Sequence, residues 1–160
     1  MAVINSEALK VVANINKKLG AGTVVTADKV RLPERITTGS LTLDVVLGGG
    51  WPMNYWVELV GEASHGKTAL ALKTIGANQK NNPEFTAVWI AAEAFDAQYA
   101  ELCGVDTQRV ILVETNSMED AFDAVIQFME SKAVDMVVVD SLPALVPSAE
   151  DEKHMEEFTV

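Results

Sequence analysis

The segment from Gly61 to Thr68 constrains the fold of this chain more than any other part of its sequence. It consists of a glycine, four further residues and the triplet Gly-Lys-Thr, which is the phosphate-binding pattern known as the P-loop. Glycines allow such a loop to turn its backbone N–H groups toward phosphate oxygens. The lysine reaches the β- and γ-phosphates of a nucleotide, and the threonine hydroxyl binds Mg²⁺. The expected nucleotide-binding residues are therefore Gly61, Glu62, Ala63, Ser64, His65, Gly66, Lys67 and Thr68.

The residues on either side of this loop predict the strand and the helix between which a P-loop lies. An apolar run at residues 56–60 predicts a strand, and the residues from Thr68 to about Asn78 predict a helix. The positive N-terminus of that helix faces the same anion as the loop. A glycine-rich turn without a ligand is the alternative, and the strand–loop–helix context argues against it.

Three further apolar runs predict strands, at residues 87–92, 110–113 and 136–139. Helices are expected between them, and strands that alternate with helices indicate an α/β fold with a mostly parallel sheet and helices on both faces. The runs are uninterrupted rather than alternating, as expected for strands buried on both faces. Gly104 is expected to end the helix that follows the strand at 87–92. Ser117 and Asp120 are expected to begin the next helix, whose apolar face consists of Phe122, Val125, Ile126 and Met129.

An amphipathic helix is expected before this core, at residues 6–19. Ser6 is a candidate cap for its start, and Gly20 for its end. The following residues, 20–54, are rich in Gly, Thr and Pro and predict a connector with short strands. The apolar face of the helix consists of Ala8, Val12, Ile15 and Leu19.

Two carboxylates directly follow predicted strands and are candidates for the chemistry of the site. Asp140 closes the last strand, where a carboxylate can hold Mg²⁺ through water beside the Thr68 hydroxyl. Glu93 closes the strand at 87–92, where it can orient or deprotonate the water that attacks a γ-phosphate. A surface glutamate at a strand end is the alternative for Glu93, and spacing alone does not choose between the two.

Composition limits the classes of protein to which the chain can belong. The net charge of −11 argues against nucleic-acid binding by bulk electrostatics, although it leaves room for a local site. A lone Cys103 excludes an internal disulfide and fits a reducing cytoplasm. No apolar run is long enough to cross a bilayer, so no membrane association is expected.

Beyond these motifs, most of the chain resembles the bacterial and phage RecA recombinase family. The resemblance includes the stretch before the P-loop, the block after Glu93 and the block around Asp140. It is therefore more specific than the P-loop pattern alone. The segments that carry it are residues 18–22, 36–44, 47–53, 92–106 and 133–147.

The resemblance implies a role for several residues of the site. Glu93 corresponds to the family's catalytic glutamate, with Lys67 as the cation on the transferred phosphate. Asp96 and Tyr99 correspond to the adenine contacts, Tyr99 by stacking, although the chain has one residue fewer than the family between Glu93 and Asp96. His65 stands where the family usually has serine and is interpreted as a polar loop residue.

The resemblance also implies an organisation and an activity. Residues 1–35 are expected to be an oligomerisation helix and connector, and residues 36–160 an ATPase core of the RecA type. The implied activity is DNA-dependent ATP hydrolysis in homologous recombination and repair, with an ATP-switched homo-oligomeric filament on single-stranded DNA. The alternative is a shortened RecA-fold ATPase or structure-specific DNA-processing protein, such as a nuclease, without strand exchange. A non-enzymatic module is disfavoured because Lys67, Thr68, Glu93 and Asp140 are all present.

Two features of the family lead to a further expectation. The first DNA-binding loop would fall at roughly residues 148–160, which are mostly acidic, while the second loop and a glutamine sensor have no counterpart here. In the family, the strand between the P-loop strand and that of Asp140 comes later in the chain. We therefore expect a sheet that residues 1–160 do not complete, and weak strand exchange by these residues alone.

Overall fold

The computed structural model describes residues 4–30 and 32–148. The chain divides into two compact units, Met1–Glu34 and Arg35–Val160. In the part that the structure describes, no helix is long and apolar enough to cross a membrane. The expected DNA-binding loop at 148–160 lies outside the described residues except for Ser148.

The first unit contains helix α1, Ser6–Leu19, as the apolar periodicity predicts. The expected cap at Ser6 is wrong: the preceding Asn5 caps the helix, because its side-chain oxygen accepts a hydrogen bond from the Glu7 N–H at 2.9 Å. Gly20 ends the helix with φ 114°, as predicted. No residue of α1 is buried, which leaves its apolar face available for contacts.

The second unit is built on a parallel sheet of three strands in the order β4-β3-β5. The strands are β3 (Ala87–Ala91), β4 (Val110–Glu114) and β5 (Met136–Asp140), close to the three predicted runs. The first of these is central, so its carboxyl end lies between those of its neighbours. In register, Ala91 is opposite both Glu114 and Asp140.

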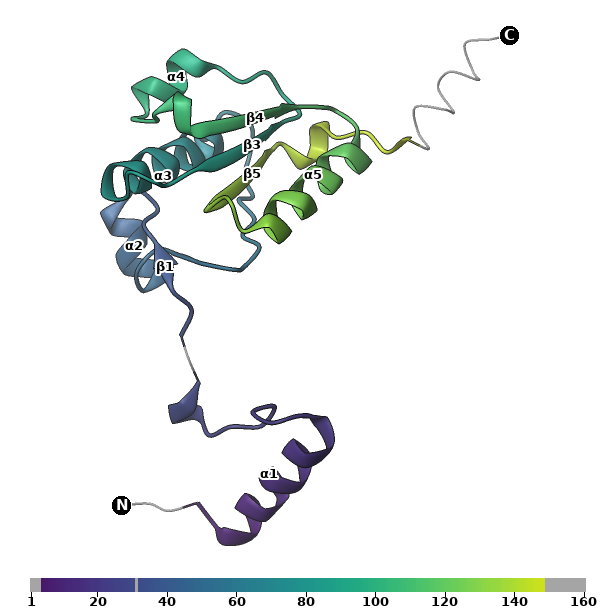
Figure 1. Cartoon of the computed structure of the whole chain (residues 1–160). Coiled ribbons are helices and arrows are strands. Elements are labelled where there is room, and N and C mark those ends of the chain that lie inside the picture. Colours follow the sequence, from purple (N-terminus) through teal and green to yellow (C-terminus); the bar gives the residue numbers. More distant parts are fainter. Residues whose placement is uncertain (1–3, 31, 149–160) are drawn as a thin grey trace. The chain divides into compact units, whose positions relative to one another are not determined.

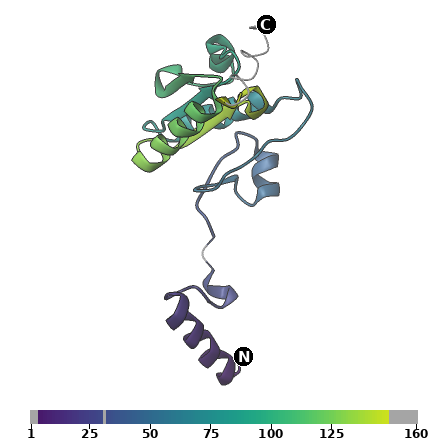
Figure 2. The same cartoon turned by 90° about the vertical axis from the view of Figure 1, so that its right-hand side faces the viewer.

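Helices cover both faces of this sheet, which confirms the expected α/β architecture (Figure 1, Figure 2). Helices α3 (Lys67–Asn81) and α4 (Ala97–Leu102) pack on one face, and α5 (Met118–Ser131) packs on the other. Successive residues of β3 point to opposite faces, so its five residues are all buried. Ala87, Trp89 and Ala91 join α3 and α4, whereas Val88 and Ile90 join α5.

The expected strand at residues 56–60 is wrong. The segment lies in no strand, and Trp56, Val57 and Val60 are exposed. A strand needs a neighbour for its backbone N–H and C=O groups. Among the described residues, none pairs with this segment, and β5 pairs with β3 alone. The sheet is therefore not completed by residues 32–148, as the family's strand order leads us to expect.

The connector contains a helix that the sequence did not indicate, α2 (Leu41–Leu47). Its apolar residues Leu41, Val45 and Val46 are exposed and form no buried face, so the sequence gives no amphipathic pattern for this helix. The predicted short strands are present, as the antiparallel pair β1 (Arg35–Ile36) and β2 (Trp51–Pro52).

Candidate functional site

The P-loop residues form an exposed turn that leads directly into α3. Gly66 caps the helix with φ 86°, a left-handed conformation that glycine adopts without strain. Ser64 also has a positive φ, of 61°. The helix runs from Lys67 to Asn81, from one residue before its predicted start to three residues beyond its predicted end. The N–H groups of its first turn have no partners within the helix, and such groups can bind an anion.

The side chain of Lys67 folds back over this turn. Its Nζ donates hydrogen bonds to the backbone oxygens of Gly61, at 2.9 Å, and Glu62, at 2.7 Å. The ammonium group therefore lies against the backbone of the first two loop residues. His65 has other partners: its Nδ1 is 2.8 Å from the Ala63 oxygen, and its Nε2 is 3.9 Å from the Glu62 carboxylate.

Thr68 and Asp140 meet although they are 72 residues apart in sequence. The Thr68 hydroxyl donates a hydrogen bond of 2.9 Å to the Asp140 carboxylate. The pKa of Asp140 is raised above its ordinary value, chiefly by burial. The hydrogen bond from Thr68 and the charge of Lys67 oppose this rise, and the charge of Glu93 adds to it. A half-buried carboxylate beside a second carboxylate is an environment that a cation would stabilise.

The oxygens of Thr68 and Asp140 suit Mg²⁺, which prefers hard oxygen ligands and usually keeps several waters. Within the described residues, no group of three or more His, Cys, Asp or Glu side chains is placed so that it could hold a metal ion. A metal at this position would therefore need ligands from a bound phosphate or from water.

Glu93 lies at the same edge of the sheet, just beyond β3. Its backbone N–H donates to the Asp140 carbonyl at 3.2 Å, and its Oε1 accepts a hydrogen bond of 2.5 Å from Ser141. The structure thus brings Thr68, Asp140 and Glu93 together. Sequence reasoning did not single out Ser141. Its place directly after Asp140 was visible, but the strand order that sets it beside Glu93 was not.

Asp96 and Tyr99 have a local structural role. Asp96 caps α4, and its Oδ1 accepts a hydrogen bond of 2.9 Å from the Tyr99 N–H. The neighbouring Cys103 raises the pKa of Tyr99, whose side chain is exposed. In the described part of the chain, no hydrogen bond joins either residue to the P-loop. Their contact with adenine stays a prediction.

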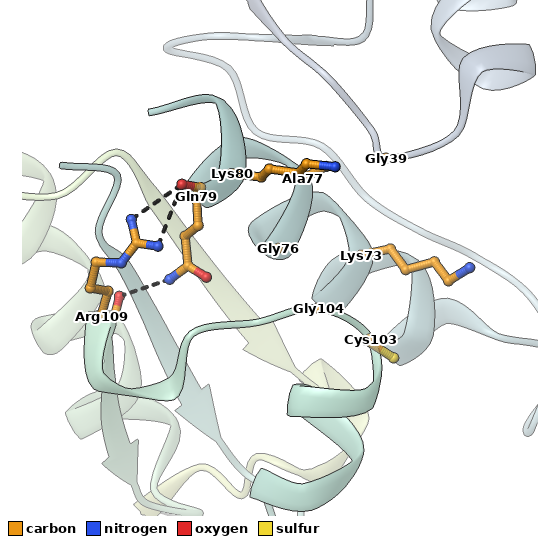
Figure 3. A pocket seen from close by; sticks show the side chains of 9 residues that line it. All are labelled: Gly39, Lys73, Gly76, Ala77, Gln79, Lys80, Cys103, Gly104 and Arg109. Atoms are coloured by element: carbon orange, nitrogen blue, oxygen red, sulfur yellow. Dashed lines mark hydrogen bonds between the residues drawn. The ribbon is translucent and has the colours of Figure 1, made fainter. Parts of the chain in front are cut away.

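A separate cavity of about 430 Å³ lies between α3 and the residues that follow α4 (Figure 3). Its wall includes Gln79 and Arg109, which hold each other: the arginine donates to the Gln79 backbone oxygen at 3.3 Å, and the Gln79 amide donates to the Arg109 oxygen at 3.4 Å. Arg109 also forms an ion pair of 2.8 Å with Asp106. These polar groups therefore hold the loop against α3, and no P-loop residue lines the cavity.

The model of the RecA N-terminal domain matches residues 6–160. The chain belongs to the RecA family. A protein of Prochlorococcus marinus (strain NATL1A) named Protein RecA is 40% identical over 154 residues, which are 94% of this chain and 40% of that protein.

Other relatives of the same name give the same result. Protein RecA of Crocosphaera subtropica is 42% identical over 153 residues, 93% of this chain and 43% of its own. Protein RecA of Synechocystis sp. is 40% identical over 152 residues, 92% of this chain and 42% of its own. The chain thus spans about two fifths of the length of these relatives. The resemblance to the RecA family and the expected fold class are confirmed.

Proposed function

We propose that this chain binds ATP with Mg²⁺ and hydrolyses it, as part of a DNA-dependent ATPase of homologous recombination and DNA repair. The observation that carries the proposal is the convergence of Thr68, Asp140 and Glu93 beside the P-loop. A nucleotide-binding loop, an oxygen pair suited to Mg²⁺ and a candidate base thereby share one edge of the sheet. Ligands of open α/β sheets bind at the carboxyl ends of the strands.

Phosphate binding is assigned to residues 61–68. Backbone N–H groups of the loop and the first turn of α3 would donate to the phosphate oxygens. Lys67 would exchange its bonds with the carbonyls of Gly61 and Glu62 for contacts with the β- and γ-phosphates. Both sets of partners are oxygen atoms, so the lysine keeps its charge-assisted hydrogen bonds throughout.

The Thr68 hydroxyl and Asp140 would hold Mg²⁺, the carboxylate through water. When bound there, the ion would supply positive charge that offsets the negative charge developing on the phosphate oxygens. Asp96 and Tyr99 are proposed to contact the adenine, which would require Tyr99 to use its exposed ring.

Glu93 is proposed as the base of the hydrolysis step. The oxygen of a water molecule bonds to the γ-phosphorus, the bond from this phosphorus to the bridging oxygen breaks, and ADP leaves. Glu93 orients the water and accepts its proton. One of its carboxylate oxygens is bonded to Ser141, and the other is available for the water.

The DNA and assembly partners follow from family membership and are also proposals. The chain would form a homo-oligomeric filament on single-stranded DNA, in which α1 of one copy docks on the next. The alternative is a shortened RecA-fold ATPase or DNA-processing protein without strand exchange.

ATP turnover with and without single-stranded DNA separates these functions. Stimulation of turnover by DNA, together with filaments in electron micrographs, is the expected result for the recombinase function. Turnover that DNA does not change, without filaments, would favour the shortened ATPase. No ATP binding at millimolar Mg²⁺ would refute both, because each depends on residues 61–68.

A further inference from the structure

We propose that Ser141 is a positioning residue for hydrolysis, which holds one oxygen of Glu93 so that the other faces the water. This inference rests on the proposed function. The Ser141 hydroxyl donates to Glu93 Oε1 at 2.5 Å, at the short end of the range for hydrogen bonds from a hydroxyl to a carboxylate. The two residues are 48 positions apart in sequence, and the side-by-side pairing of β3 and β5 brings them together.

Backbone contacts hold both partners of this bond in register. The Asp140 carbonyl accepts hydrogen bonds from the N–H groups of Ala92, at 3.1 Å, and Glu93, at 3.2 Å. Ser141 follows immediately and begins a 3-10 turn, in which its own carbonyl accepts from the Ala144 N–H at 3.1 Å. The hydroxyl of Ser141 is therefore presented from backbone that directly follows β5, beside the segment that follows β3 and contains Glu93.

Glu93 needs such a partner because its side chain is exposed and otherwise free to rotate. A base must stay within hydrogen-bond reach of the proton that it accepts, and a displacement of about 1 Å can cost on the order of 100-fold in rate. Since Ser141 occupies Oε1, the bond leaves Oε2 for the water. The carboxylate is thereby oriented without losing its ability to accept a proton.

The chain contains a second pair of a hydroxyl and a glutamate that provides a matched control. The Thr107 hydroxyl donates a hydrogen bond of 3.2 Å to Glu101 Oε1. This pair joins α4 to the 3-10 turn Thr107–Arg109. Loss of its hydroxyl reports what a hydroxyl–glutamate bond contributes to structure alone.

The experiment compares Ser141→Ala, Ser141→Thr and Thr107→Ala in the full chain, after circular dichroism has shown that each variant is folded. We expect Ser141→Ala to lower kcat about tenfold, as the loss of one charge-assisted hydrogen bond implies, and to change KM less than twofold. Ser141→Thr keeps a hydroxyl and should restore most of the rate. Thr107→Ala should leave kcat unchanged. In a Glu93→Gln background, Ser141→Ala should have no further effect.

A second measurement does not depend on turnover. In protein labelled with ¹³C-glutamate, NMR compares the carboxyl signal of Glu93 between the unmodified chain and each variant, at one pH and without nucleotide. Ser141→Ala should shift and broaden this signal, and Ser141→Thr and Thr107→Ala should leave it in place. An unshifted signal in Ser141→Ala would overturn the proposal, as would a kcat equal to that of the unmodified chain. If Glu93→Gln retains turnover, the base assignment fails, whereas the carboxyl signal still decides whether Ser141 holds Glu93.

Discussion

At the scale of single residues, Lys67 is where we expect nucleotide binding to be most sensitive. Lys67→Ala removes the ammonium group that lies over the loop. Loss of charge-assisted bonds to two phosphates should weaken ATP–Mg²⁺ binding by about 100-fold, measured by titration calorimetry. Lys73→Ala, an exposed residue further along the same helix, is the control with the same charge change. Equal ATP affinity in the two variants would contradict the assignment.

Glu93 should separate binding from chemistry. In Glu93→Gln the amide fits the same space but cannot accept the proton from water, so ATP affinity should stay within about twofold while hydrolysis falls by about 100-fold or more. Phosphate release in single-turnover conditions measures the step directly. Glu114→Gln is the matched control, because Glu114 ends the neighbouring strand β4 in the same register. Comparable losses of hydrolysis in Glu93→Gln and Glu114→Gln would mean that either glutamate at this edge of the sheet affects hydrolysis, and that Glu93 is not the specific base.

The candidate site could be predicted from sequence only as far as its residues depend on local pattern. Lys67 and Thr68 follow from the P-loop spacing, and Asp140 and Glu93 from carboxylates placed after apolar runs. Ser141 could not be predicted as a partner of Glu93, because their contact depends on β3 lying beside β5. Strand order is set by packing across the whole sheet, which no local pattern records.

At the scale of elements, the packing of α3 depends on Gly76. A glycine inside a helix is usually improved by alanine, by about 1 kcal/mol. Here a Cβ at position 76 would lie 2.6 Å from the backbone carbon and oxygen of Gly104, which follows α4. We expect Gly76→Ala to lower the free energy of unfolding by about 1–3 kcal/mol, because the loop must move. Urea denaturation measures this change. A gain in stability would show that the loop at Gly104 moves to make room for the Cβ without a loss of free energy.

The elements that the sequence predicted are those with a strong local signal. Helices α3 and α5 and the three strands β3 to β5 combine apolar runs or periodic faces with capping residues, and all are present. The strand at 56–60 has the same apolar signal, but a strand forms only with a neighbour, and the described residues supply none. Helix α2 is the opposite case: it is present although the sequence did not predict it, because its apolar residues are exposed and form no buried face.

At the scale of the whole molecule, the division into Met1–Glu34 and Arg35–Val160 separates the proposed assembly element from the proposed ATP site. Both hydrophobic clusters consist of residues from Ile36 onward. Removal of residues 1–34 should therefore leave the ATP affinity within about twofold and the unfolding temperature within a few degrees, since it takes no residue from either cluster.

The same truncation should abolish self-association, because α1 has an apolar face that is not buried. Val12→Asp should have the same effect as truncation, since a charge on this face cannot be buried in an interface without a partner. Asn14→Asp makes the same charge change on the opposite side of the helix and should assemble normally. Sedimentation velocity with ATP and Mg²⁺ distinguishes the variants. Assembly of the Val12→Asp protein equal to that of Asn14→Asp would show that copies of the chain meet through another surface.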